Sequence, residues 1–131
     1  MVKKKKSVQE ATAMAESRAV EDAMSVSKMR ASLKEIKKFD GVIGYILRNS
    51  TSAAIDIKDS TKIMDYAVLS SSAFDAGEEF SELFDLGGIE NIVIEGKDVK
   101  VLSLTINENN ISIFMEKNAD CNKILRKLRE L

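Results

Sequence analysis

The sequence predicts an α+β fold, a three-layer α/β/α sandwich built on one five-stranded antiparallel sheet. Apolar side chains recur every three or four residues in three segments and alternate in five others, in the order α-β-β-α-β-β-β-α. The longest helical segment lies between a hairpin and a three-stranded meander, so both groups of strands can join one sheet with helices on both faces. The first strand is apolar on both sides, which is typical of a strand in the middle of a covered sheet.

Length and composition indicate one soluble domain with an N-terminal arm. A chain of 131 residues can bury one hydrophobic core, and 44% hydrophobic with 31% charged residues is ordinary for a globular protein. The apolar runs are too short to cross a bilayer, and the basic start lacks the apolar stretch of a signal peptide. The single cysteine, Cys121, cannot form an internal disulfide. We therefore expect a cytoplasmic protein.

Charge is unevenly distributed along the chain. Residues 1–39 have a net charge of +5 and residues 40–131 a net charge of −6. Residues 75–90 hold six acidic side chains and no basic one, so this stretch repels nucleic acid and attracts a basic protein surface. The lysines Lys3 to Lys6 could bind an anionic membrane or nucleic acid. The arm, however, lacks aromatic residues that would stack on bases and bulky apolar residues that would insert into lipid. We expect a solvated arm, no nucleic-acid partner, and membrane contact, if any, only through these lysines.

The first helix is predicted to start at Ser25 or Ser27 and to end at Lys38. Its buried stripe has spacings of three and four residues and consists of Val26, Met29, Leu33 and Ile36. The preceding residues favour a helix but offer mainly alanines for burial. We therefore predict a basic, mobile or partner-dependent helical arm over residues 1–25 and a domain over residues 26–131.

Two strands follow, over residues 41–49 and 51–58, with Asn49 and Ser50 at the turn between them. The second strand is less apolar on one of its faces, which suits a position nearer the edge of the sheet.

The longest helix is predicted over residues 60–86, with Asp59 or Ser60 as its N-cap. Serines and alanines occupy its centre, and such small side chains let another backbone approach closely. Gly87 and Gly88 then supply left-handed residues that end the helix. The helical stripe comprises Ile63, Ala67, Ser70, Phe74, Gly77, Phe80 and Phe84.

Three short strands within residues 91–117 and a final helix over residues 119–131 complete the fold. Asp120 is the expected N-cap of this helix, and its later turns carry Lys and Arg side chains, which the helix dipole favours. Its apolar stripe consists of Ile124, Leu128 and Leu131.

No feature of the sequence indicates catalysis. The chain has no histidine, neither a GxxxxGK[ST] nor a GxGxxG phosphate loop, and too few cysteines for a zinc site. We therefore predict no catalytic, cofactor-binding or metal-binding residue and no enzyme activity. Cys121 is either a small, partly buried side chain or, beside a helix N-terminus, a thiol with a lowered pKa. Arg48 is either a solvated charge or a donor to a partner.

Two stretches of the sequence resemble the roadblock/dynein light-chain family. FDGVIGYILRN, at residues 39–49, is similar to the family's first strand and its leading turn of small residues. ELFDLGGIENIVIEG and the residues after it, through NADCNKIL, contain the helix exit, three strands and the closing helix in family order. The resemblance covers residues 26–131. It does not extend to the basic arm, and the first hairpin turn lacks the aspartate and glycine that are common in the family.

The resemblance implies a homodimeric scaffold that binds partners. Family members pair through their long helices and through the strand that matches NIVIE at a sheet edge, and an uncovered edge strand would itself invite pairing. The predicted dimer interface consists of Ile92, Ile94, Ala67, Ser70, Ser71 and Phe74. Family partners include Ras-like small GTPases in bacteria and archaea, so we expect such a partner. A basic surface on it would suit the acidic side chains Glu78, Glu79, Glu82 and Asp85.

A second function class stays open, a small-ligand-sensing regulatory domain of profilin-like shape. Mixed sandwiches of this size also serve that purpose, and a pocket with converging polar groups between the sheet and a helix would favour it.

Overall fold

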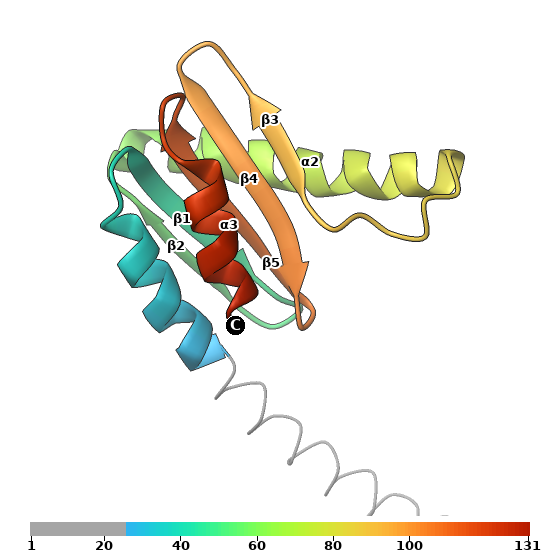
Figure 1. Ribbon diagram of the computed structural model, residues 1–131, viewed down its shortest axis with the longest axis horizontal. Helices are drawn as coiled ribbons and strands as arrows, with labels where there is room; N and C mark the ends of the chain where they lie inside the picture. The colour runs from blue at the N-terminus through green and yellow to red at the C-terminus, as the bar shows by residue number, and fades with distance from the viewer. Residues whose placement is uncertain (1–25) are drawn as a thin grey trace, which may run out of the picture.

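The computed structural model describes residues 26–131, which form a three-layer α/β/α sandwich (Figure 1). The predicted arm over residues 1–25, with Lys3 to Lys6, lies outside the described residues. Residues 26–37 are helical. The remaining elements are β1 Val42–Arg48, β2 Ala53–Ile57, the short 3-10 helix η1 Ser60–Lys62, α2 Ile63–Leu83, β3 Ile92–Glu95, β4 Val99–Ile106, β5 Asn109–Glu116 and α3 Cys121–Arg129. The predicted fold class and element order are therefore confirmed.

All five strands form one antiparallel sheet in the order β2-β1-β5-β4-β3. β1 lies inside the sheet between β2 and β5, as its two apolar faces predict. β2 and β3 are the two edge strands, so β3 pairs only with β4 and its other side is unpaired within the described chain.

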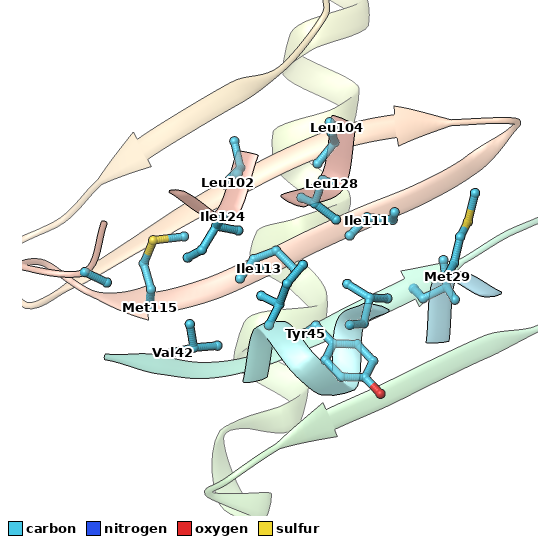
Figure 2. Close-up of a cluster of buried hydrophobic side chains, with 14 residues drawn as sticks. Met29, Val42, Tyr45, Leu102, Leu104, Ile111, Ile113, Met115, Ile124 and Leu128 are labelled. Carbon is cyan, nitrogen blue, oxygen red and sulfur yellow. The ribbon is translucent and has the colours of Figure 1, made fainter. Parts of the chain in front are cut away.

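Helix 26–37 and α3 cover one face of the sheet and bury the larger core beneath them (Figure 2). The predicted helical stripes supply Met29, Leu33 and Ile36 from the first helix and Ile124 and Leu128 from α3. The sheet contributes mainly branched aliphatic side chains and Met115 to this core. Asp120 caps α3 as predicted, because its carboxylate accepts the N–H of Lys123.

α2 crosses the opposite face of the sheet (Figure 1). A smaller core lies under it, in which Tyr66 stacks on the buried Phe114 with ring centroids 4.5 Å apart. The buried residues of α2 are the small ones, Ser70, Ala73 and Gly77. Because these side chains are small, the backbone of α2 approaches the sheet closely. The sequence predicts that another backbone comes close to the centre of this helix, and in the structure that backbone belongs to the chain's own sheet.

Three buried serines form a chain of hydroxyls between α2 and the sheet. Ser112 Oγ lies 2.6 Å from Ser70 Oγ and 2.8 Å from Ser103 Oγ. All three side chains are buried, so each hydroxyl depends on its neighbours for hydrogen bonding.

Ser112→Ala is expected to lower the free energy of unfolding by about 2 kcal/mol, because it leaves two buried hydroxyls without their shared partner. Urea denaturation would measure this loss. Thr105→Ala is the matched control, since it removes an exposed hydroxyl that donates to Asn110 Oδ1 at 2.9 Å. Its expected cost is below about 0.5 kcal/mol. Equal losses for the two variants would contradict a special role for the buried chain.

The predicted end of the long helix is wrong by three residues. α2 ends at Leu83, and the left-handed position that follows is taken by Asp85, with φ 52°, and not first by Gly87 or Gly88. The N–H of Leu86 reaches back to the carbonyl of Ser81, which satisfies a terminal carbonyl in a Schellman arrangement. Aspartate tolerates this conformation better than most residues, so the chain turns before the glycines.

Candidate dimerisation surface

The C-terminal part of α2 extends past the edge strand β3 (Figure 1). Phe80 and Phe84 lie near the same side of the helix as the buried Gly77, by their spacing of three and four residues. They are nevertheless 54% and 67% exposed, because they lie beyond the edge of the sheet. Their rings contact each other, with centroids 6.3 Å apart. The side of α2 that is buried against the sheet at Gly77 is therefore exposed to solvent at the C-terminal end of the helix.

Further large apolar side chains are exposed on the same part of the fold. We define the overhang surface as the exposed large apolar residues at the end of α2, in the loop after it and on β3, which are Phe80, Leu83, Phe84, Leu86, Ile89, Val93 and Ile94. Exposed apolar residues gathered in this way are characteristic of protein–protein interaction sites.

β3 adds an open strand edge to this surface. It has only four residues and contains neither proline nor a basic side chain, the usual means of blocking unwanted pairing. Val93 and Ile94 point to opposite faces of the sheet and are both exposed. The backbone and both faces of β3 are therefore accessible to a further strand.

The predicted interface residues have different surroundings. Ser70 is 6% exposed and bonded to Ser112, so it faces the chain's own sheet. Ala67 packs on the smaller core, and Ile92 lies under α2, where a Cβ on Gly77 would come within 2.6 Å of Ile92 Cδ1. Ile94 is exposed, and Ser71 and Phe74 are partly buried, as Ala67 and Ile92 are. All six residues stay predictions for a dimer interface.

The predicted partner surface is exposed as a group. Glu78, Glu79 and Glu82 lie on α2, Asp85 follows directly, and all four side chains are exposed. α2 carries no basic residue along its whole length, so its outer face has a negative potential.

A hollow of about 220 Å³ lies between α2, β4 and the segment before β3. Its hydroxyls bond within the chain: Ser103 to Ser112, Thr105 to Asn110, and Ser81 to the N–H of Gly88. Sites for small organic ligands usually have 300 to 1,000 Å³ and polar groups free to converge on the ligand. This hollow does not support the ligand-sensing alternative, whereas a second one, of about 550 Å³ between β4 and α3, has the size of such a site.

Arg48 is exposed at the end of β1. Within residues 26–131, no three His, Cys, Asp or Glu side chains come together in a way that would hold a metal ion.

No helix among the described residues is both long enough and apolar enough to span a bilayer.

Burial raises the pKa of the Cys121 thiol, and the nearby Lys100 offsets only part of this effect. We therefore expect Cys121 to react with iodoacetamide at pH 7.5 several-fold more slowly than free cysteine, because less of it is thiolate. Mass spectrometry over a time course would measure the rate, with the protein in 8 M urea as the unfolded reference. Faster labelling in the folded protein would instead indicate an activated thiolate.

Comparison with known proteins identifies the class of fold. No family model and no curated protein matches the sequence. Among solved structures, the chain is similar to those of roadblock/LC7 domains, so the resemblance to the roadblock/dynein light-chain family is confirmed at the level of the fold.

Two solved structures illustrate the similarity. The roadblock/LC7 domain from Streptomyces avermitilis superposes with a TM-score of 0.61 at 13% identity, over 77% of this chain and 85% of that one. Myxococcus xanthus MglB superposes with a TM-score of 0.61 at 10% identity, over 79% of this chain and 87% of that one.

Proposed function

We propose that this protein is a non-catalytic homodimeric scaffold that binds and regulates a Ras-like small GTPase in the cytoplasm. The observation that carries the dimer is the overhang of α2 beyond β3, with Phe80 and Phe84 uncovered on the sheet-facing side. A second copy that pairs its β3 antiparallel with this one would bring its own sheet under the overhang. The same symmetry would cover the first copy's edge in return.

This arrangement also suits the rest of the overhang surface. Pairing of the two β3 strands satisfies backbone groups that otherwise face water and removes an aggregation-prone edge. Leu83 is exposed on the flank of α2, where an antiparallel α2 of the second copy would lie. One two-fold interface would therefore bury aromatic, aliphatic and backbone groups together.

The GTPase partner is supported by the fold and by charge. The family that the sequence resembles includes proteins that bind Ras-like small GTPases in bacteria and archaea. Glu78, Glu79, Glu82 and Asp85 form an exposed acidic surface on and just after α2, which would attract a basic surface on such a partner and speed its association.

Titration of the source organism's Ras-like GTPases against the protein tests the partner. Each GTPase is loaded with GDP or with a non-hydrolysable GTP analogue, and isothermal titration calorimetry measures the affinity. We expect at least one GTPase to bind in one nucleotide state. Combined reversal of the acidic side chains Glu78, Glu79 and Glu82 to lysine is expected to weaken binding about tenfold or more.

The control variant reverses Asp40, Asp98 and Glu116, which are exposed outside α2. It changes the net charge by the same amount and is expected to bind as the wild type does. Absence of binding by every GTPase in both nucleotide states would contradict the proposed partner. Equal weakening by both variants would show that only net charge matters.

A further inference from the structure

The two helical layers of the sandwich carry opposite charge. α2 has five acidic side chains and no basic one. On the other face, residues 26–37 have four basic side chains and one acidic one, and α3 has four basic side chains and no acidic one. The near-neutral net charge of the chain, −1, therefore conceals a separation of charge across the sheet.

Helix 26–37 and α3 lie side by side and run in opposite directions (Figure 1). Lys127 Nζ lies 3.0 Å from Glu35 Oε2, and Lys123 Nζ lies 4.5 Å from the centre of the Phe39 ring. Since the apolar stripes of both helices face the sheet, their remaining positions form one outward surface.

Several basic side chains on this surface are exposed and unpaired. Lys37 bonds Asp56 and Lys127 bonds Glu35. The other basic residues of the two helices make no ion pair within residues 26–131. These six residues are all exposed. Lys123 lies over the Phe39 ring, and the other five define the basic layer: Lys28, Arg30, Lys34, Arg126 and Arg129.

We propose that the basic layer docks the protein onto an anionic lipid bilayer, with the acidic α2 layer facing away from the membrane. A bilayer with anionic lipids attracts each nearby Lys or Arg by about 1 kcal/mol, which is about fivefold in affinity. The acidic layer would be repelled, so the same charge separation fixes the orientation. The sequence alone placed any membrane contact in Lys3 to Lys6, whereas the layer lies on the folded domain.

The form of the layer favours a membrane over nucleic acid. The two helices lie side by side on one face of the sheet (Figure 1), so their outward side chains form one broad surface that a bilayer can contact. The layer has no exposed large aromatic side chain on which bases could stack, since Phe39 is partly buried beside Lys123.

Membrane binding through the basic layer does not require the proposed dimer. The dimer would only double the number of basic side chains that face the membrane. Antiparallel pairing of two β3 strands in one sheet requires a two-fold axis perpendicular to that sheet. Both basic layers would then face the same side, and both acidic layers the other. Two layers on one rigid body bind a surface more tightly than either alone.

Flotation with lipid vesicles tests the proposal on the full chain. Vesicles of phosphatidylcholine with 30% phosphatidylserine are compared with pure phosphatidylcholine at 100 mM salt. We expect binding only to the anionic vesicles and a loss of binding as salt rises. Arg126→Ala combined with Arg129→Ala is expected to weaken binding about 25-fold or more, from two contributions of about fivefold each.

Two controls separate the layer from net charge and from the arm. Arg48→Ala with Lys62→Ala removes the same charge outside the two helices and is expected to bind as the wild type does. A variant with alanine at Lys3 to Lys6 is expected to keep binding that still depends on Arg126 and Arg129. The proposal is overturned if the anionic vesicles do not bind, if the Arg126 and Arg129 variant binds normally, or if the control pair weakens binding equally.

Two further measurements distinguish the remaining outcomes. If the protein shifts the electrophoretic mobility of a 30-base-pair DNA duplex but does not bind anionic vesicles, the membrane proposal is overturned in favour of nucleic-acid binding. Light scattering on the same samples reports the oligomeric state. A monomer whose vesicle binding depends on Arg126 and Arg129 would refute the proposed dimer but not the membrane surface.

Discussion

Replacing Phe80 and Phe84 together by glutamate is expected to convert the dimer into a folded monomer, with at least about a 1,000-fold loss of dimer affinity. Buried aromatic anchors at the centre of an interface often cost 2 kcal/mol or more each when they are removed, and two buried carboxylates would add a desolvation penalty. Sedimentation equilibrium or light scattering over a concentration series measures the dissociation constant.

The fold should survive this change because both rings are more than half exposed in the single chain. Circular dichroism and urea denaturation of the monomer would verify that it is intact. Met64→Glu with Val68→Glu is the matched control. These apolar side chains lie on the same helix and are 73% and 59% exposed, but they lie in its first half, away from its C-terminal end.

The control is expected to remain a dimer. A wild-type protein that is monomeric at 100 μM would refute the dimer. A dimer that tolerates both changes in α2 would require an interface elsewhere than the overhang surface.

Gly44→Ala is expected to lower the free energy of unfolding by about 3 kcal/mol, although alanine is only one methyl group larger. Gly44 lies in the middle of β1, where β2 approaches so closely that a Cβ would overlap the carbonyl oxygen of Asp56. It would also come within 2.8 Å of the Cα of Ile57. Both obstacles are backbone atoms, so a rotamer change cannot relieve the overlap and the two strands must separate.

Urea denaturation monitored by circular dichroism gives the change in stability. Ala53→Val, at the exposed start of β2, enlarges a side chain in the same hairpin without a backbone obstacle. Its expected effect lies within about 0.5 kcal/mol, since β-branched residues suit strands. A Gly44→Ala protein as stable as this control would show that β2 can move away at little cost.

The sequence predicts the fold well because the fold depends on local patterns. The helical stripe of residues 26–37 and the alternation in β1 each report which side of an element is buried, and both predictions are confirmed. The end of α2 was harder to predict, because Asp85 adopts a left-handed conformation that the sequence suggested for glycine.

The overhang was not predicted because periodicity reveals the side of a helix and not the width of the sheet under it. Phe80 and Phe84 continue the stripe of Ser70 and Gly77, so they read as buried residues. The overhang could have been predicted by comparing the length of the helix with the width of the sheet. The 21 residues of α2 span about 31 Å, whereas five strands span about 19 Å from first to last axis. A helix that crosses such a sheet extends past one of its edges.

The chain of buried hydroxyls between α2 and the sheet also determines how far that helix projects. Sliding α2 along its axis by one turn, about 5.4 Å, would separate Ser70 from Ser112 and leave hydroxyls stranded among apolar groups. The hydrogen bonds among the three serines thus hold α2 at one position along its axis and so set the length of the segment that projects past β3. Substitutions of these serines are therefore expected to affect the proposed dimer from a distance, without any change in the residues of its interface.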